Sequence, residues 1–203
     1  MLEKTNNSIS QHVSRETYND LMGYKNLLLK WNHSLNLVGN STLENFNKRH
    51  LLDAIQLKEY IEEKHNRIID FGSGGGIPVI ILCIIFKDKH FFALESDKRK
   101  SVFLKHVALK LGLNNIEVIC KRINNIKNLE ADLCISRACA TLSTLLNYTL
   151  QHSKNGTEAL FLKGENLHAE ITLANHYEFK YSIHQSITND NAHIIKISNI
   201  CRK

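Results

Sequence analysis

Apolar and polar residues follow two different patterns along the chain, one before residue 61 and one after it. The first sixty residues are predicted to be helical, because Leu27, Leu28, Trp31 and Leu35 recur at helical spacing and 51–55 gives a second apolar face. We therefore expect an N-terminal helical cap over residues 1–60 and a separate core over 61–203.

From residue 61 onward, short apolar segments alternate with amphipathic ones, which is typical of a parallel sheet covered by helices on both faces. Strands are predicted at 67–70, 90–95, 116–120, 132–136 and 158–162. Helices are predicted at 77–86, 96–111 and 141–153, with Gly156 as the stop of the last. Two further strands, 179–185 and 193–198, flank a turn around Asn189 and suit a hairpin at the sheet edge. The expected fold class is a doubly wound α/β sheet.

Composition limits the kinds of protein that fit this pattern. The chain has 203 residues, 43% of them hydrophobic, which suffices for one substantial core. It has no apolar run long enough to span a bilayer and no signal-peptide pattern, so we expect a cytoplasmic protein without a membrane partner. Neither a disulfide framework nor a metal site is predicted, because no C-x-x-C or H-E-x-x-H spacing occurs. We expect most of the five cysteines to be core thiols: Cys83, Cys120, Cys134, Cys139 and Cys201.

The net charge of +6 is concentrated in two clusters, one formed by Lys98, Arg99, Lys100 and Lys105 and the other by residues 48–50. Such clusters favour a polyanionic partner. An ordinary solvated surface gives the same pattern, so charge alone does not decide whether the protein binds nucleic acid.

The most informative chemical pattern joins the first predicted strand to the next helix and reads Asp-Phe-Gly-Ser-Gly-Gly-Gly-Ile-Pro, beginning at Asp70. Glycines at such a turn let the backbone bend sharply and approach a ligand closely. An acidic residue followed by Gly72, Gly74 and Gly76 at alternate positions favours S-adenosylmethionine over a nucleotide. The alternative is a flexible loop without a ligand.

Two nucleotide-binding motifs fit this stretch less well. The dinucleotide fingerprint needs a third glycine where this chain has Ile77 or Val79, depending on the starting glycine, which weakens the NAD interpretation without excluding it. The phosphate-binding loop of ATPases and GTPases needs a Gly-Lys pair, and the sequence contains none. The sequence therefore argues against ATP or GTP hydrolysis.

A second acidic residue, Glu95, ends the second predicted strand. Ligands of doubly wound sheets bind at the carboxyl ends of the strands, so Glu95 is expected to accept hydrogen bonds from ribose hydroxyls. The competing interpretation places Glu95 in the solvated N-terminal region of the following helix.

Four motifs occur in an order that identifies a family, and a fifth, Lys163-Gly164, follows the fifth predicted strand. The four are Trp31-Asn32 with Asn36-Leu37, Arg49-His50-Leu51-Leu52-Asp53, the stretch 70–78, and Ile135-Ser136-Arg137-Ala138. In these motifs the sequence resembles the small-subunit 16S ribosomal RNA guanine-N7 methyltransferases, also called the glucose-inhibited division protein B family. The resemblance implies a class I S-adenosylmethionine-dependent methyltransferase fold, which is Rossmann-like, with a helical cap. It also implies methyl transfer to N7 of one guanine in the decoding region, with 16S rRNA or the small subunit as partner. Separately, we expect the protein to be a monomer.

The resemblance also implies cofactor contacts at Gly72, Ile77, Ile123, Asn124 and Arg137. The chain departs from the family pattern at four positions. Glutamate replaces aspartate at Glu95, which keeps the carboxylate, and an amide replaces a frequent acid at Asn124. The other two departures are Ala54 in place of serine and Ala192 in place of an arginine, the latter weakening the expected RNA contact.

The chemistry of N7 methylation needs little from the protein beyond positioning. Guanine N7 has a free lone pair and no proton, so a general base is unnecessary and orientation supplies most of the acceleration. Adenine-N6 and cytosine-N4 enzymes are excluded, because they need a Pro-Pro motif after the fourth strand and Pro78 is the only proline. A cytosine-C5 enzyme needs an activated thiolate. Cys139 lacks an obvious base partner and is interpreted as packing.

Arg137 is the candidate substrate-positioning residue, since its planar fork suits phosphate, carboxylate or a guanine edge; the alternative is a surface ion pair. His50 and Asp53, three residues apart, are predicted to share a structural hydrogen bond that fixes the cap over the cofactor; the alternative is a catalytic role. Lys163 is expected to meet RNA phosphate or to support the pocket. The full set predicted to face RNA is Arg49, His50, Lys98, Arg99, Lys100 and Lys163.

Two other functions share the same cofactor loop. A small-molecule methyltransferase would not need the basic clusters, and a noncatalytic module would bind S-adenosylmethionine without turnover.

Overall fold

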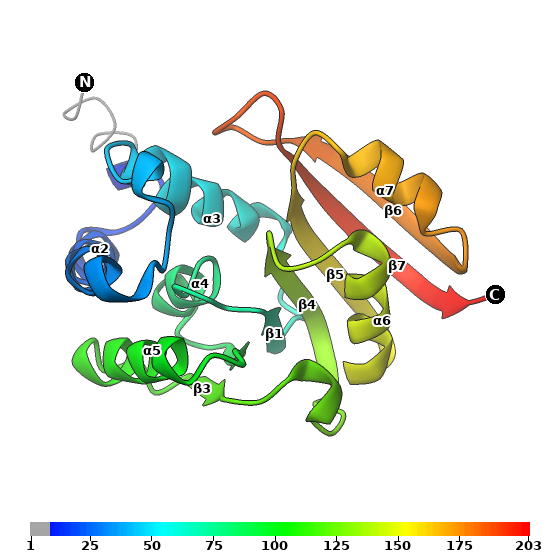
Figure 1. Ribbon diagram of the computed structural model, residues 1–203, viewed down its shortest axis with the longest axis horizontal. Coiled ribbons are helices and arrows are strands. Elements are labelled where there is room, and N and C mark those ends of the chain that lie inside the picture. Colours follow the sequence, from blue (N-terminus) through cyan, green and yellow to red (C-terminus); the bar gives the residue numbers. More distant parts are fainter. Residues whose placement is uncertain (1–8) are drawn as a thin grey trace.

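The structure of the protein, a computed structural model, describes residues 9–203 (Figure 1). Residues 1–8 of the predicted cap lie outside the described part. Seven strands form one sheet in the order β3-β2-β1-β4-β5-β7-β6, the first five parallel and β7 antiparallel to both of its neighbours. The predicted parallel sheet with an edge hairpin is therefore confirmed. The strands are β1 (Arg67–Phe71), β2 (His90–Leu94), β3 (Ile116–Ile119), β4 (Ala131–Arg137), β5 (Ser153–Lys163), β6 (Tyr177–Gln185) and β7 (His193–Arg202).

Helices cover both faces of this sheet (Figure 1). One face carries α2 (Arg15–Leu35), α4 (Val79–Ile85) and α5 (Lys98–Lys110), and the other carries α6 (Leu142–His152) and α7 (Leu167–Leu173). Short helical turns complete the chain: η1 (Asn40–Thr42), the π-helix η2 (Asn47–Leu52), α3 (Asp53–Ile55), η3 (Gln56–Tyr60) and η4 (Ile123–Asn125). Among residues 9–203, none of these helices has the length and hydrophobicity needed to cross a membrane.

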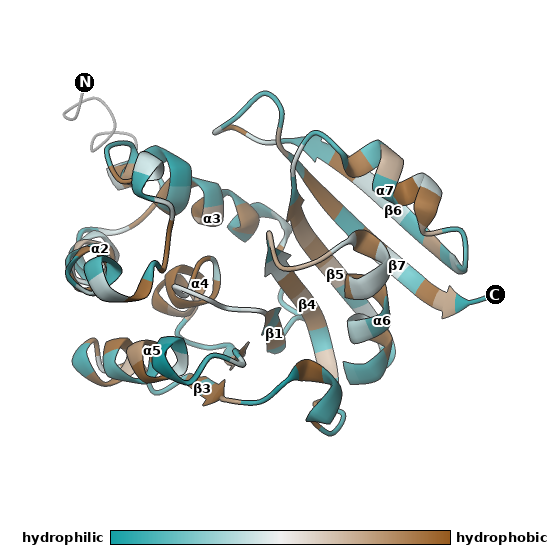
Figure 2. Ribbon diagram, viewed as in Figure 1, coloured by the Kyte–Doolittle hydropathy of each residue, from teal (hydrophilic) through white to brown (hydrophobic). Residues whose placement is uncertain are grey.

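The core consists of two hydrophobic clusters, one on each face of the sheet. Successive strand residues point to opposite faces, so Ile68 belongs to the first cluster and Ile69 to the second. The first cluster also contains Leu21 and Leu28 of α2 together with Ile80 of α4, so the N-terminal helices share this core with the sheet. Figure 2 shows the hydrophobic residues concentrated on the strands and on α4.

The structure corrects the sequence prediction between α6 and β5. Gly156 does not stop α6, which ends at His152, and the chain enters β5 directly at Ser153. The early part of β5 pairs with the start of β4, where Ala131 lies opposite Ser153 and Thr157 Oγ1 donates to the Ala131 carbonyl. Gly156 has φ +84°, so it provides an irregular bend inside this extended segment.

The structure differs from the sequence prediction at two further points. Helix α7 was not predicted, because its seven residues are too few to show a clear apolar period. The cysteines are less buried than expected: Cys83 and Cys134 lie in the core, whereas Cys139 and Cys201 are exposed and Cys120 is partly exposed.

Candidate methyl-transfer site

The glycine loop lies between β1 and α4, as predicted, although α4 begins only at Val79 and Ile77 is buried in the preceding turn. Gly72, Gly74 and Gly76 all have positive φ, from +54° to +87°, a region that side-chain-bearing residues rarely adopt. Helix α2 contacts the loop directly, since Tyr24 Oη donates a 2.6 Å hydrogen bond to the Gly75 carbonyl. The loop conformation therefore depends on both its glycines and the cap.

Glu95 follows β2 and lies against this loop, with 9% of its surface exposed. Its Oε2 accepts the Gly74 N–H at 2.8 Å and its Oε1 accepts the Asp97 N–H at 2.8 Å. The N-cap of α5 is Asp97, which accepts from the backbone of Arg99 and Lys100. Each Glu95 oxygen retains a lone pair, which fits two ribose hydroxyls.

Asp70, at the end of β1, is a buried carboxyl with 1% of its surface exposed. Its Oδ2 has no hydrogen-bond partner among residues 9–203. Burial raises the pKa of Asp70 from 3.8 to about 7, opposed by the Ser73 hydroxyl and the charge of Arg137. A buried acid that has one oxygen without a partner fits a site that receives a polar or cationic ligand.

This pKa predicts an unusual pH dependence of stability. Between about pH 4 and pH 7 the unfolded chain has lost the Asp70 proton and the folded protein keeps it, so the contribution of Asp70 to stability falls as pH rises. We expect Asp70→Asn to remove this fall, which amounts to about 4 kcal/mol at most. Urea unfolding at pH 5 and pH 8 measures it, with Asp88→Asn at an exposed position as control. An unchanged pH slope in Asp70→Asn would contradict the assignment.

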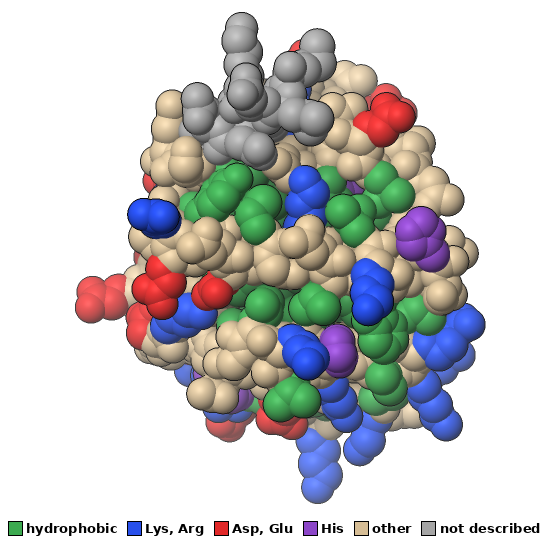
Figure 3. Space-filling view, turned by 90° about the vertical axis from the view of Figure 1, so that its left-hand side faces the viewer, with side chains coloured by type: hydrophobic (Ala, Val, Ile, Leu, Met, Phe, Trp, Pro, Cys, Tyr) green, Lys and Arg blue, Asp and Glu red, His purple; other side chains and the backbone are tan. Residues whose placement is uncertain are grey.

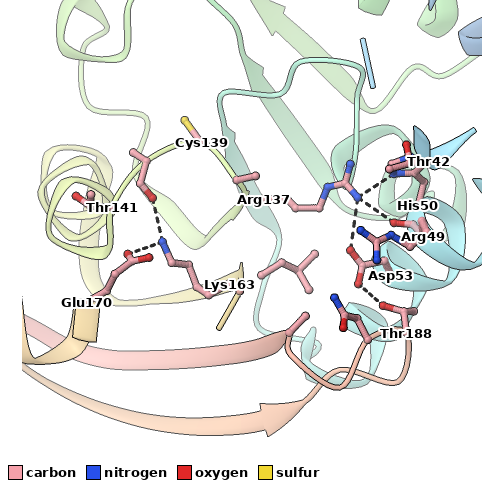
Figure 4. Close-up of a pocket in the computed structure, with 16 residues that line it drawn as sticks. Thr42, Arg49, His50, Asp53, Arg137, Cys139, Thr141, Lys163, Glu170 and Thr188 are labelled. Carbon is pink, nitrogen blue, oxygen red and sulfur yellow. Dashed lines mark hydrogen bonds and ion pairs between the residues drawn. The ribbon is translucent and has the colours of Figure 1, made fainter. Parts of the chain in front are cut away.

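Beside the loop lies a cavity of about 580 Å³, into which side chains from distant parts of the chain point (Figure 4). Its walls come from η1 and η2, from the ends of β4 and β5, from α7 and from the tip of the β6–β7 hairpin. Cys139 connects cavity and loop, because a Cβ placed on Gly72 would lie only 2.4 Å from its Sγ. Although Cys139 as a residue is exposed, partial burial of its thiol, followed by the charges of Asp70 and Glu95, raises the pKa of Cys139, which agrees with the absence of an activated thiolate. Ala192 also lines the cavity.

Arg137 forms the first wall of the cavity (Figure 4). Its NH1 donates to the Arg49 carbonyl at 3.2 Å and to His50 Nδ1 at 3.0 Å, and it lies 3.5 Å from Asp53 Oδ2. Burial, followed by the charges of Arg137 and Arg49, lowers the pKa of His50 to about 3. Neutral His50 thus accepts at Nδ1 and donates from Nε2 to Thr42 Oγ1 at 2.7 Å. No direct His50–Asp53 hydrogen bond forms between these described side chains; both instead contact Arg137, whose side chain is only 21% exposed.

Asp53 links this wall to the β6–β7 hairpin. Its Oδ1 accepts from Thr188 Oγ1 at 2.7 Å and from Gln56 Nε2 at 3.0 Å. Gln56 in turn donates to Ser186 Oγ and accepts the Ile187 N–H. These hairpin residues are not predictable from the sequence, because short polar residues in a turn carry no signal of a partner some 130 positions away.

Lys163 forms the second wall, at the end of β5, with its side chain 7% exposed. Its Nζ donates to the Ala140 carbonyl at 3.0 Å and to Glu170 Oε2 at 2.6 Å. The same Glu170 oxygen accepts the Leu142 N–H at 2.5 Å, at the start of α6. Glu170 was missed in the sequence because α7 was not predicted.

The remaining predicted residues lie away from the cavity. Lys98, Arg99 and Lys100 form the first turn of α5, and none of them lines the cavity. Figure 3 shows lysine and arginine side chains gathered along the lower edge of the face that carries α2 and α5. The Ile123 carbonyl accepts from Gln151 Nε2 at 3.1 Å, and Asn124 lines a separate hollow beside α6 and the end of β7.

Glu62, His65 and Glu158 form a second cluster, near the start of β1, whose ligand atoms lie within 4.8 Å of one another. Lys64 forms ion pairs with both glutamates, as does Lys196. His65 Nδ1 accepts the Glu62 N–H at 3.0 Å, so neutral His65 carries its proton on Nε2, the nitrogen facing Glu158. This protonation state favours an ion-pair network over metal binding.

The sheet order, the glycine loop after β1 and the carboxylate after β2 define a class I S-adenosylmethionine-dependent methyltransferase. Solved structures confirm the fold: M. jannaschii TYW2 in complex with AdoMet has a TM-score of 0.57 at 16% identity, covering 82% of this chain and 78% of that chain. A SAM-dependent methyltransferase from Aquifex aeolicus gives 0.59 at 14% identity, covering 80% and 94%.

Sequence comparison identifies the family. The model of the rRNA small subunit methyltransferase G family matches residues 17–197. Ribosomal RNA small subunit methyltransferase G of Orientia tsutsugamushi (strain Boryong) is 44% identical over 191 residues, 94% of each chain. That of Paracoccus denitrificans (strain Pd 1222) is 36% identical over 189 residues, 93% of this chain and 97% of the relative. This chain belongs to the rRNA small subunit methyltransferase G family, and its cofactor is S-adenosylmethionine.

Proposed function

We propose that this protein transfers the methyl group of S-adenosylmethionine to N7 of one guanine in 16S rRNA of the small ribosomal subunit. The observation that carries the proposal is the cavity beside the glycine loop, walled by Arg137 and Lys163 and large enough for a base. Family membership over residues 17–197 supports rRNA as the substrate.

The cofactor would be held by the loop and by the two acids beside it. Gly72, Gly74 and Ile77 supply the turn, Glu95 offers lone pairs to the ribose, and Asp70 lies beneath the loop. Following the family resemblance, we also assign Ile123 and Asn124, which come after β3, to the adenine end. S-adenosylmethionine supplies a sulfonium-bound methyl group.

The residues of the cavity suit methylation of an unprotonated nitrogen. His50 is neutral, and both of its ring nitrogens are engaged, so it is not a free base. Arg137 uses only NH1 for its bonds to the described residues, which leaves Nε and NH2 to position either the substrate or the methionine carboxylate. Positioning of this kind is what N7 methylation requires.

We further propose that the basic residues outside the cavity bind the rRNA backbone. Arg49 lies at the rim, and Lys98, Arg99 and Lys100 are at the start of α5. Cationic side chains at such positions contact phosphates without reading sequence. We expect residues 1–60 to act as a cap over the site. We also expect the protein to be a monomer and to act in the cytoplasm, where its substrate is found.

Mass mapping of 16S rRNA from cells that lack the protein tests the proposal. We expect one guanine to lose its N7 methyl group and to regain it when the purified protein and S-adenosylmethionine are added to small subunits from those cells. Unchanged rRNA together with methylation of extracted metabolites would favour a small-molecule substrate. Retention of the cofactor without turnover on either would favour a noncatalytic module.

A further inference from the structure

The second wall of the cavity presents a hydrogen-bond donor next to an acceptor. The ammonium of Lys163 carries three protons, of which two are donated, to the Ala140 carbonyl and to Glu170 Oε2. Oε2 also accepts the Leu142 N–H, whereas Oε1 accepts from nothing within residues 9–203. One ammonium proton and one carboxylate oxygen therefore remain for a ligand, on two side chains that line the cavity (Figure 4).

The fold keeps this donor and acceptor in a fixed order. Lys163 is the last residue of β5, and its side chain is 7% exposed. Glu170 lies in the first turn of α7 and is anchored to the start of α6 through Leu142. Because both side chains are anchored, the wall is organised before a ligand binds, which lowers the cost of recognition.

Guanine and adenine carry a donor and an acceptor in opposite order along the edge that contains N1 and the group at position 6. Guanine offers the O6 acceptor beside the N1–H donor, whereas adenine offers an amino donor beside the N1 acceptor. An ammonium beside a carboxylate matches guanine and opposes adenine. We propose that Lys163 donates to O6 of the target base and that Glu170 Oε1 accepts its N1–H, an inference that rests on the proposed function.

This contact explains selectivity and also affects rate. O6 and N7 lie on the same edge of guanine, so a base held through O6 keeps N7 close to the wall and free of any hydrogen bond. Methylation of N7 places positive charge on the base, which makes N1–H a stronger donor. Its bond to the Glu170 carboxylate strengthens in the transition state, so loss of Glu170 lowers kcat as well as raising KM.

The test uses small subunits reconstituted with 16S rRNA whose target guanosine is kept or replaced. Inosine keeps O6 and N1–H, whereas 2-aminopurine riboside keeps N7 and the 2-amino group but lacks both. We expect the wild-type protein to methylate inosine within about tenfold of guanosine, and 2-aminopurine riboside about 100-fold more slowly.

The variant Glu170→Gln has nearly the shape of the wild type but presents amide protons toward N1–H. We expect kcat/KM to fall about 10- to 100-fold on guanosine and inosine, with no further loss on 2-aminopurine riboside. Lys163→Met is expected to give the same selective loss. Glu165→Gln, at an exposed position on the same segment, is the matched control and should behave as wild type.

Two results would overturn the assignment. One is wild-type methylation of 2-aminopurine riboside at the guanosine rate, which needs no variant and so does not depend on folding. The other is an equal loss on all three substrates in Glu170→Gln, which would show a purely structural role. Failure of the proposed function itself looks different, because the wild-type protein would then transfer no methyl group to guanosine-containing subunits.

Discussion

Replacing Arg137 with methionine is expected to lower kcat/KM for the small subunit by about 100- to 1000-fold, as loss of one preorganised donor does in other enzymes. The structure gives the reason. NH1 of Arg137 is held by Arg49, His50 and Asp53, so the rest of the guanidinium is oriented before substrate arrives. Methionine retains much of the packing and removes the donors. Steady-state methylation assays with labelled S-adenosylmethionine measure the loss.

Three comparisons show whether the loss arises from positioning. Arg137→Lys keeps the charge but not the fork, and we expect it to recover less than a tenth of the activity. Arg15→Met, at an exposed position of α2, should leave the rate unchanged. Thermal unfolding should place Arg137→Met within about 3 kcal/mol of the wild type, since Asp53 keeps its other donors. A variant that folds and methylates normally would exclude Arg137 from the site.

Local sequence patterns were sufficient for the parts of this fold that depend on local chemistry. The alternation of strands and helices from β1 to α5 is strong, because each strand is apolar on both faces and each helix amphipathic or buried. The glycine loop was equally predictable, because a turn of this kind requires glycine, and Gly72, Gly74 and Gly76 all adopt positive φ. The carboxylate after β2 was found from its position alone.

The parts that were missed depend on contacts between distant segments. Glu170 is informative only because α7 places it beside Lys163, and Thr188 only because a hairpin brings it to Asp53. The predicted His50–Asp53 bond failed for the same reason: a third side chain, Arg137, lies between them from the end of β4. Sequence spacing along one helix cannot show a residue that enters from another element.

Replacing Gly76 with alanine is expected to destabilise the protein by about 2–5 kcal/mol, the sum of left-handed backbone strain and overpacking. Gly76 has φ +87°, and an added Cβ would lie 2.5 Å from Ile80 Cγ1 and 3.0 Å from Leu104 Cδ2. These neighbours are fully buried and belong to the core cluster beneath the loop. Because the turn itself would shift, we also expect the thermal stabilisation by S-adenosylmethionine to disappear.

Two other glycines separate these contributions. Gly112 has φ +62° with no atom of residues 9–203 within 4 Å of an added Cβ, so Gly112→Ala should carry only the backbone strain, about 1–2 kcal/mol. Gly164 has no positive φ and, in the described part of the chain, no atom within 4 Å of an added Cβ, so its alanine variant should unfold like the wild type. Urea unfolding of all three variants gives the series. Equal losses of stability in Gly76→Ala and Gly112→Ala would show that the loop can move away from Ile80. Retained cofactor binding in Gly76→Ala would show that the turn keeps its function without a glycine at this position.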